Sequence, residues 1–192
     1  MAATAAPYGL VPVNRIGGYE NGSFRQFKLT NSYGTSIFFG DVAELDANGL
    51  IIADQNTTST RPIGVFQGCS YTDPTLKYKL FNQMWLASVS ATDILAHVAD
   101  DPNQLFQVQS DATMAQTTLG NNVEFITYAA GNVNIGKSIL AIDGANAATT
   151  NTFPVRVIDF VDGPLSEVGD AYTDVIVRWA FGIHQYELAL GT

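Results

Sequence analysis

The chain has 192 residues, of which 46% are hydrophobic and 14% charged, and its 9 basic and 18 acidic side chains give a net charge of −9. A hydrophobic fraction close to the globular average of about 45–50% excludes a disordered chain, and the length suits one domain. With so few basic residues the chain is not suited to displace counterions from phosphate, and its charge opposes an anionic membrane. We therefore expect no nucleic-acid partner and no membrane partner.

The first 18 residues differ from the rest because their apolar side chains follow neither a helical nor a strand period. Pro7 and Pro12 favour an extended path, and an isolated extended segment cannot bury its own apolar side chains. Residues 1–18 are therefore predicted to form an extended N-terminal arm that lies on the chain's own body or on a neighbour. No basic stretch precedes an apolar one, so we expect no export signal. The apolar residues of the arm are Tyr8, Leu10, Val11, Val13 and Ile16.

From residue 24 onward, apolar and polar residues alternate with the period of two that is typical of strands. Asn48-Gly49 lies between two apolar runs and predicts a tight hairpin turn, because both residues tolerate positive φ. Segments 93–99 and 111–119 are each predicted to hold one or two helical turns. We expect an all-β fold over residues 19–192, with about eight to ten strands in a small barrel or sandwich and few short helices. The strand signals lie at 24–29, 40–45, 50–52, 62–66, 77–81, 106–109, 123–128, 155–161 and 175–181.

Few residues are suited to catalysis or to metal binding. The two histidines, His97 and His184, have no HxH or HExxH spacing, and the sequence has no GxSxG, P-loop or GxGxxG motif. We therefore expect no enzyme, no metal site and no cofactor. The single cysteine, Cys69, cannot form an intrachain disulfide, so we expect a buried thiol in a protein made in a reducing cytoplasm.

Two acidic patterns are interpreted as turns rather than as calcium sites. Asp46-x-Asn48-Gly49 is similar to the opening of an EF-hand loop, but apolar residues follow where further ligands would be needed. A loose acidic cluster surrounds a loop that begins at Asp162, and capping of turns is the preferred interpretation there. This cluster comprises Asp159, Asp162, Asp170 and Asp174.

Three segments resemble head-decoration (cement) proteins of tailed phages, of the lambda type. The first is APYGLVPV at 6–13, followed by RIGG at 15–18. The second is the hairpin GDVAELDANG at 40–49, and the third is the strand RPIGVF at 61–66. The resemblance rests on the order and spacing of these segments, and it covers roughly residues 7–110.

The resemblance implies a small barrel of the β-tulip kind, with residues 111–192 as an extension beyond the minimal family barrel. It also implies a homotrimer on the outer surface of the virion capsid, which binds the major capsid protein and cements neighbouring subunits against the pressure of packaged DNA. In that family an ordered N-terminal arm often makes the contact. We therefore expect a capsid-binding arm in which Arg15 pairs with a capsid carboxylate; its residues are Tyr8, Leu10, Val11, Val13, Arg15 and Ile16.

Two other classes of function stay open at this stage. A virion attachment protein, such as a head fibre or tail adhesin, would bind a host-surface glycan, and an exposed Trp85 or Trp179 would favour it. A lyase or hydrolase on a β scaffold would need a pocket that gathers His97 or His184 with two carboxylates.

Overall fold

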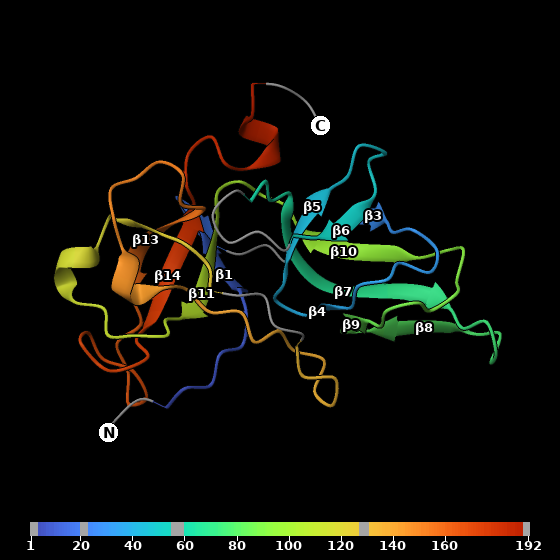
Figure 1. Ribbon diagram of the computed structural model, residues 1–192, viewed down its shortest axis with the longest axis horizontal. Helices are drawn as coiled ribbons and strands as arrows, with labels where there is room; N and C mark the ends of the chain where they lie inside the picture. Colours follow the sequence, from blue (N-terminus) through green and yellow to red (C-terminus); the bar gives the residue numbers. More distant parts are fainter. Residues whose placement is uncertain (1–3, 20–22, 55–59, 127–130, 190–192) are drawn as a thin grey trace.

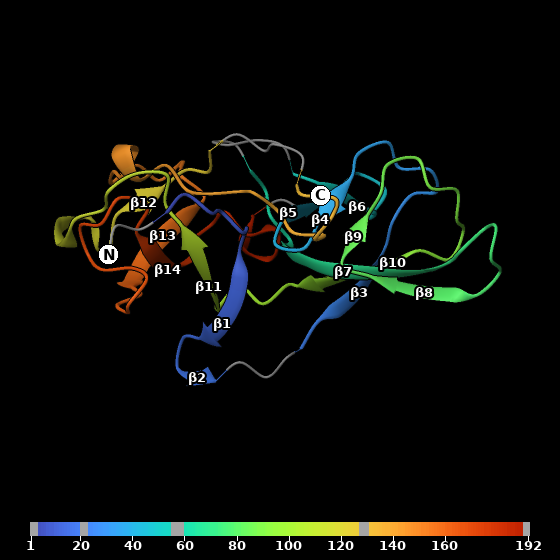
Figure 2. The same cartoon turned by 90° about the horizontal axis from the view of Figure 1, so that it is seen from below.

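The computed structural model describes residues 4–19, 23–54, 60–126 and 131–189, which form two β lobes arranged along the long axis (Figure 1). We call them lobe I, at the left of Figure 1, and lobe II, at the right. Figure 2 shows the same division from a second direction. Each lobe is built on its own sheet and has its own cluster of buried apolar side chains.

Lobe I is a six-stranded sheet in which every neighbouring pair is antiparallel. Side chains of alternate residues point into its core, so that Val175, Val177 and Trp179 are buried while the residues between them are partly exposed. Trp179 packs edge-on against Phe106, with 5.5 Å between ring centroids. In spatial order the strands are β12 (Asn122–Val123), β13 (Val155–Phe160), β14 (Asp174–Trp179), β11 (Gln104–Gln109), β1 (Val11–Arg15) and β2 (Gly18–Tyr19).

Lobe II is a second antiparallel sheet, and its core surrounds Trp85 and Phe66. The nine-residue β7 is its longest strand; it pairs with β10 on one side, and with β5 and β8 on the other. A small two-stranded sheet, β4 (Ile37–Phe38) with β9 (Met84–Trp85), covers part of this core. The main sheet comprises β3 (Arg25–Lys28), β10 (Leu95–Ala99), β7 (Gly64–Thr72), β5 (Val42–Leu45), β6 (Ile51–Ala53) and β8 (Lys79–Asn82).

The all-β class that the sequence predicts is confirmed. Over the described residues the sheets do not close into the expected barrel: in lobe II, the bridge that these residues form between the two edges is an isolated one, between Leu29 and Ile51. The hairpin turn at 46–49 is present, with Gly49 at φ +72° and the Asp46 carboxylate accepting hydrogen bonds from the N–H groups of Asn48 and Leu50.

The helical predictions are wrong for segment 93–99 and partly right for segment 111–119. Residues 95–99 form β10 because Ala96 and Val98 point into the core of lobe II while the backbone pairs with β3 and β7. The described helices are short 3₁₀ turns: Gln116–Thr118, Gly144–Asn146 and Gln185–Glu187. Of the strand predicted at 123–128, Val123 lies in β12, while residues 124–126 lie in no strand and Phe125 forms an isolated bridge with Ile142. Residues 127 and 128 lie outside the described residues.

The two lobes meet at a tightly packed junction around Gly9 and Gly40. The Leu10 N–H donates a hydrogen bond to the Gly40 carbonyl at 2.9 Å. Both glycines have positive φ, and a Cβ on Gly9 would lie 2.7 Å from the Gly40 oxygen, so only glycine fits there. The core of lobe I continues through this junction to Val42 and Val65 of lobe II. The lobes therefore share apolar packing.

Candidate functional site

The N-terminal segment is part of lobe I rather than a free arm. Residues 11–15 form β1, which pairs with β11 and β2. Leu10 is fully buried in the core, and Val11 and Val13 are half-buried. The Tyr8 hydroxyl donates a hydrogen bond to the Asp174 carboxylate at 3.1 Å, and burial, together with that carboxylate, raises the pKa of Tyr8 well above its usual value. Of the two surfaces predicted for this segment, the structure therefore shows the chain's own body.

The structure places two of the predicted contact residues, Arg15 and Ile16, in different surroundings. Arg15 forms an ion pair with Asp101 of the same chain, so its guanidinium is engaged without any capsid carboxylate. Ile16 is 47% exposed at the turn between β1 and β2. Tyr19, on β2, is 91% exposed. We call Ile16 and Tyr19 the β1–β2 tip, and it is the part of the N-terminal segment that is open to a partner.

A second apolar projection lies at the far end of lobe II, on the hairpin between β7 and β8 (Figures 1 and 2). Tyr78 and Phe81 are 53% and 77% exposed, and Leu76 is similar. The Asp73 carboxylate accepts hydrogen bonds from the N–H groups of Thr75 and Leu76, which fixes the turn. Large exposed apolar side chains on an ordered projection are typical of surfaces that contact other proteins.

Sequence reasoning missed Tyr19 and the β7–β8 hairpin as contact residues. A signal was available in both places, because large apolar residues stand close to turn formers there. Gly17-Gly18 precedes Tyr19, and Asp73-Pro74 precedes Leu76. A strand pattern does not show which of its faces is covered, so exposure had to come from the structure.

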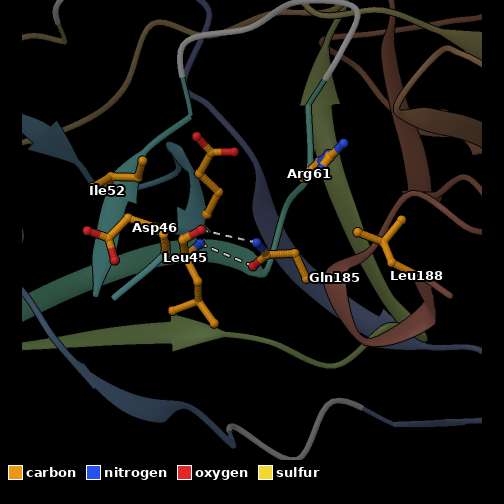
Figure 3. Close-up of a pocket in the computed structure, with 8 residues that line it drawn as sticks. Leu45, Asp46, Ile52, Arg61, Gln185 and Leu188 are labelled. Carbon is orange, nitrogen blue, oxygen red and sulfur yellow. Dashed lines mark hydrogen bonds between the residues drawn. The ribbon is translucent and has the colours of Figure 1, made fainter. Parts of the chain in front are cut away.

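A cavity of about 290 Å³ lies beside β5, where the C-terminal segment crosses lobe II (Figure 3). The Gln185 side chain binds both backbone groups of Leu45: its oxygen accepts from the N–H at 3.1 Å and its nitrogen donates to the carbonyl at 3.3 Å. Figure 3 shows these two bonds at the wall of the cavity. The lining residues are Glu44, Leu45, Asp46, Ala47, Ile52, Arg61, Gln185 and Leu188.

The electrostatics of this cavity centre on Glu44. Burial and the nearby Asp54 carboxylate raise the pKa of Glu44 to about 7, against the opposing effect of Arg61. A carboxyl that titrates near neutral pH is often functional, but none of the eight lining residues is a Ser, Cys, His or Lys that would act with it. The two hydrogen bonds of Gln185 make this cavity a contact between β5 and the C-terminal segment.

The two histidines lie in different surroundings. His184 is fully buried beside Trp179; its Nδ1 accepts a hydrogen bond from the Tyr186 N–H, and burial lowers its pKa. His97 is half-buried on β10. Among the described residues, no group of three His, Cys, Asp or Glu side chains is placed to hold a metal ion.

The remaining candidate residues described below are either buried or part of a turn. Cys69 is buried, and burial raises the pKa of its thiol to about 12. In the acidic cluster the Asp170 carboxylate accepts a hydrogen bond from the Glu167 N–H, which is a turn-capping contact. Trp85 and Trp179 are 0% and 1% exposed, so neither offers the exposed stacking surface that a glycan-binding protein would use.

Comparison with known proteins gives no match: no family model, no curated protein and no solved structure is similar to this chain. In the part of the chain that the structure describes, none of the helices has the length and apolar character needed to cross a membrane.

Proposed function

We propose that the chain is a structural protein of a tailed-phage virion that binds the outer surface of the capsid. In this proposal it acts as a homotrimer, contacts the major capsid protein and holds neighbouring capsid subunits together against the pressure of packaged DNA. The observation that carries the proposal is the placement of large exposed apolar side chains on two ordered projections, the β1–β2 tip and the β7–β8 hairpin. Such surfaces favour a protein that works by contact.

The residues that carry the resemblance to decoration proteins have definite structural roles, which supports the proposal. The segments 40–49 and 61–66 become neighbouring antiparallel strands, with Val42 opposite Val65 and Ala43 opposite Gly64. The Asp41 carboxylate accepts a hydrogen bond from the Phe38 N–H at 2.7 Å. The two motifs therefore lie side by side in lobe II, because their segments pair as β5 and β7.

The β1–β2 tip replaces the whole arm as the proposed capsid contact. Leu10 is buried in the core and Arg15 forms an ion pair with Asp101, whereas Tyr19 is almost fully exposed. An exposed tyrosine supplies a large apolar face and one polar group, which is why tyrosine is enriched where proteins bind each other. Its backbone is held by pairing to β1, so little conformational entropy is lost on binding.

Stabilisation of the shell follows from mass action. A ligand that binds only the assembled lattice raises the free energy of opening it by RT ln(1+[L]/Kd), about 2.7 kcal/mol at roughly 100-fold excess over Kd. Repetition over a symmetric shell multiplies this modest effect, because many copies must be released before the lattice opens.

Binding to particles that lack the protein tests this proposal. Wild-type chain, Tyr19→Ser and Phe181→Ser are titrated onto such particles, and the bound amount is measured after sedimentation. Phe181 is the matched control because it is 84% exposed on lobe I, outside both projections. We expect Tyr19→Ser to weaken binding about tenfold or more, as for a contact worth over 1.4 kcal/mol, and Phe181→Ser to bind as wild type. Absence of wild-type binding would reject the capsid role itself.

A further inference from the structure

Charge is divided unevenly along the chain. Residues 100–192 contain 11 acidic and 3 basic residues, whereas residues 1–99 contain 7 acidic and 6 basic ones. Most of lobe I comes from the acidic half, and lobe II comes from the nearly neutral half. The difference in charge is clearest at two features: an acidic loop on lobe I and a groove with two lysines on lobe II.

The acidic loop, residues 162–167 between β13 and β14, is held in a tight turn by hydrogen bonds. Gly163 and Ser166 form a backbone bridge, with hydrogen bonds of 2.8 and 3.3 Å, and this places Leu165 in the tight turn. The Ser166 hydroxyl accepts a hydrogen bond from the Asp174 N–H at 2.9 Å and so ties the loop to β14. Leu165 is 77% exposed, and the exposed carboxylates of Asp162 and Glu167 flank it.

The groove lies on lobe II, where the end of β3 approaches β8 and the β5–β6 turn. Its volume is about 440 Å³, within the usual range of about 300–1,000 Å³ for binding pockets. Leu29 and Ile94 are buried in its floor. Its lining residues are Lys28, Leu29, Thr30, Asn31, Leu50, Lys79, Thr92, Asp93, Ile94 and Leu95.

The charges at the groove leave one lysine available. Lys79 pairs with Asp93 at 3.2 Å, and Asp93 is the one acidic residue among the lining residues. Lys28 is exposed and belongs to none of the three ion pairs that the described residues form. The groove therefore combines an apolar floor with a net positive rim.

We propose that the acidic loop of one copy of this chain docks into the Lys28–Lys79 groove of a second copy. Leu165 fills the apolar floor, and Asp162 and Glu167 lie beside Lys28, the lysine that Asp93 does not pair. The acidic loop, between β13 and β14, and the strands β3, β8 and β10 that contribute to the groove lie toward opposite ends of the long axis (Figure 1), so one molecule cannot join its own. Because the two surfaces differ, the contact is head-to-tail, and repeated contacts build a closed ring or an open filament. The contact forms between copies of the chain and does not involve the capsid, so it is tested on the chain alone.

Sedimentation equilibrium over a concentration series tests whether copies associate at all. The contact is small, so it belongs to the weak class and needs high protein concentration. We expect association that weakens as salt rises, because exposed charge pairs are screened. A chain that stays monomeric at the highest concentration would overturn the proposal, as would association that increases with salt.

Charge reversal tests which surfaces meet. Lys28→Glu reverses a charge of the groove, and Asp162→Lys reverses a charge of the loop. Each variant alone is therefore expected to self-associate at least tenfold more weakly than wild type. Mixed together, the two variants should associate again, because the reversed groove meets the reversed loop and the intact groove meets the intact loop. Lys137→Glu, an exposed lysine outside both surfaces, is the matched control and should behave as wild type.

A mixture that stays monomeric while wild type associates would overturn the pairing of these two surfaces. Single variants that associate as strongly as wild type would do the same. Circular dichroism of each variant establishes that it is folded before the comparison is made. Leu165→Ser provides a second test of the same contact without any change of charge, and it should weaken association at both low and high salt.

Discussion

Lobe I and lobe II have the same kind of core but are assembled from the chain in different ways. The strands of lobe II all come from residues 25–99, a continuous stretch. Lobe I combines β1 and β2, from the first 19 residues, with four strands from residues 104–179. Its sheet therefore depends on strand pairings that are distant in sequence, and we expect these to form more slowly than local pairings. The comparison shows that the N-terminal segment is a structural part of lobe I.

Each lobe contains one of the two tryptophans, Trp179 in lobe I and Trp85 in lobe II, and both are buried. A Trp85→Phe background leaves Trp179 as the reporter of lobe I, and Trp179→Phe leaves Trp85 as the reporter of lobe II. Unfolding in urea followed by fluorescence then measures the two lobes separately.

The largest expected effect is the loss of Leu10 from the core of lobe I. Leu10→Ala should lower the free energy of unfolding by about 2–5 kcal/mol, because it leaves a cavity at a fully buried site. The Trp179 reporter should record the loss most strongly. Ile16→Ala is the control, and its exposed side chain makes a change within about 0.5 kcal/mol the expected result. Equal effects at both positions would contradict the burial of Leu10.

The second effect concerns close backbone packing in lobe II. A Cβ on Gly64 would collide with the carbonyl of Ala99 on β10, so Gly64→Ala should destabilise the fold by about 1–3 kcal/mol. Gly18→Ala is the control, since nothing lies within 4 Å of its Cβ. Here the Trp85 reporter should respond first. A neutral Gly64→Ala would mean that β7 and β10 are farther apart than described.

The third effect is on the coupling between the lobes. Gln185→Ala removes both hydrogen bonds to Leu45 and leaves a partly buried N–H without its partner, at a cost of about 1–3 kcal/mol. The two reporters should then unfold at more widely separated urea concentrations than in the parent protein. Gln116→Ala, at an exposed position, should leave the separation unchanged. An unchanged separation in Gln185→Ala would show that the C-terminal segment does not couple the lobes.

The smallest effect is a dependence of stability on pH. The pKa of Glu44 is raised to about 7 in the folded state, above its unfolded value, so the folded protein binds the extra proton between the two values. The stabilising contribution is complete below the unfolded pKa and is lost as pH rises through about 7. Glu44→Gln should therefore gain stability relative to wild type between pH 5 and pH 8. A difference that is constant with pH would contradict the raised pKa.

The sequence predicted the elements whose signals are local. The hairpin at Asn48-Gly49 is present, and the strand predicted at 175–181 is present over residues 174–179, because turn chemistry and a half-buried strand leave a direct pattern. Residues 93–99 were misread as helical turns because the pattern of Ala96 and Val98 is set by pairing with β3 and β7, which a local reading does not contain.

The candidate site was harder to predict than the fold. Leu10 and Tyr19 are both large apolar residues beside glycines and prolines, yet one is fully buried and the other almost fully exposed. Leu10 lies at the junction of the lobes, where its N–H donates a hydrogen bond to the Gly40 carbonyl, whereas Tyr19 lies on β2 at the edge of the sheet. Exposure, and with it the proposed contact surface, is therefore a tertiary property.

Thermal release of DNA from filled particles tests the central claim most directly. Particles are prepared without this protein, and then with wild-type chain or with Tyr19→Ser added back, and DNA release is followed as temperature rises. We expect wild-type chain to raise the release temperature and Tyr19→Ser to raise it less at equal concentration. Release at the same temperature with and without bound wild-type protein would contradict a cementing role.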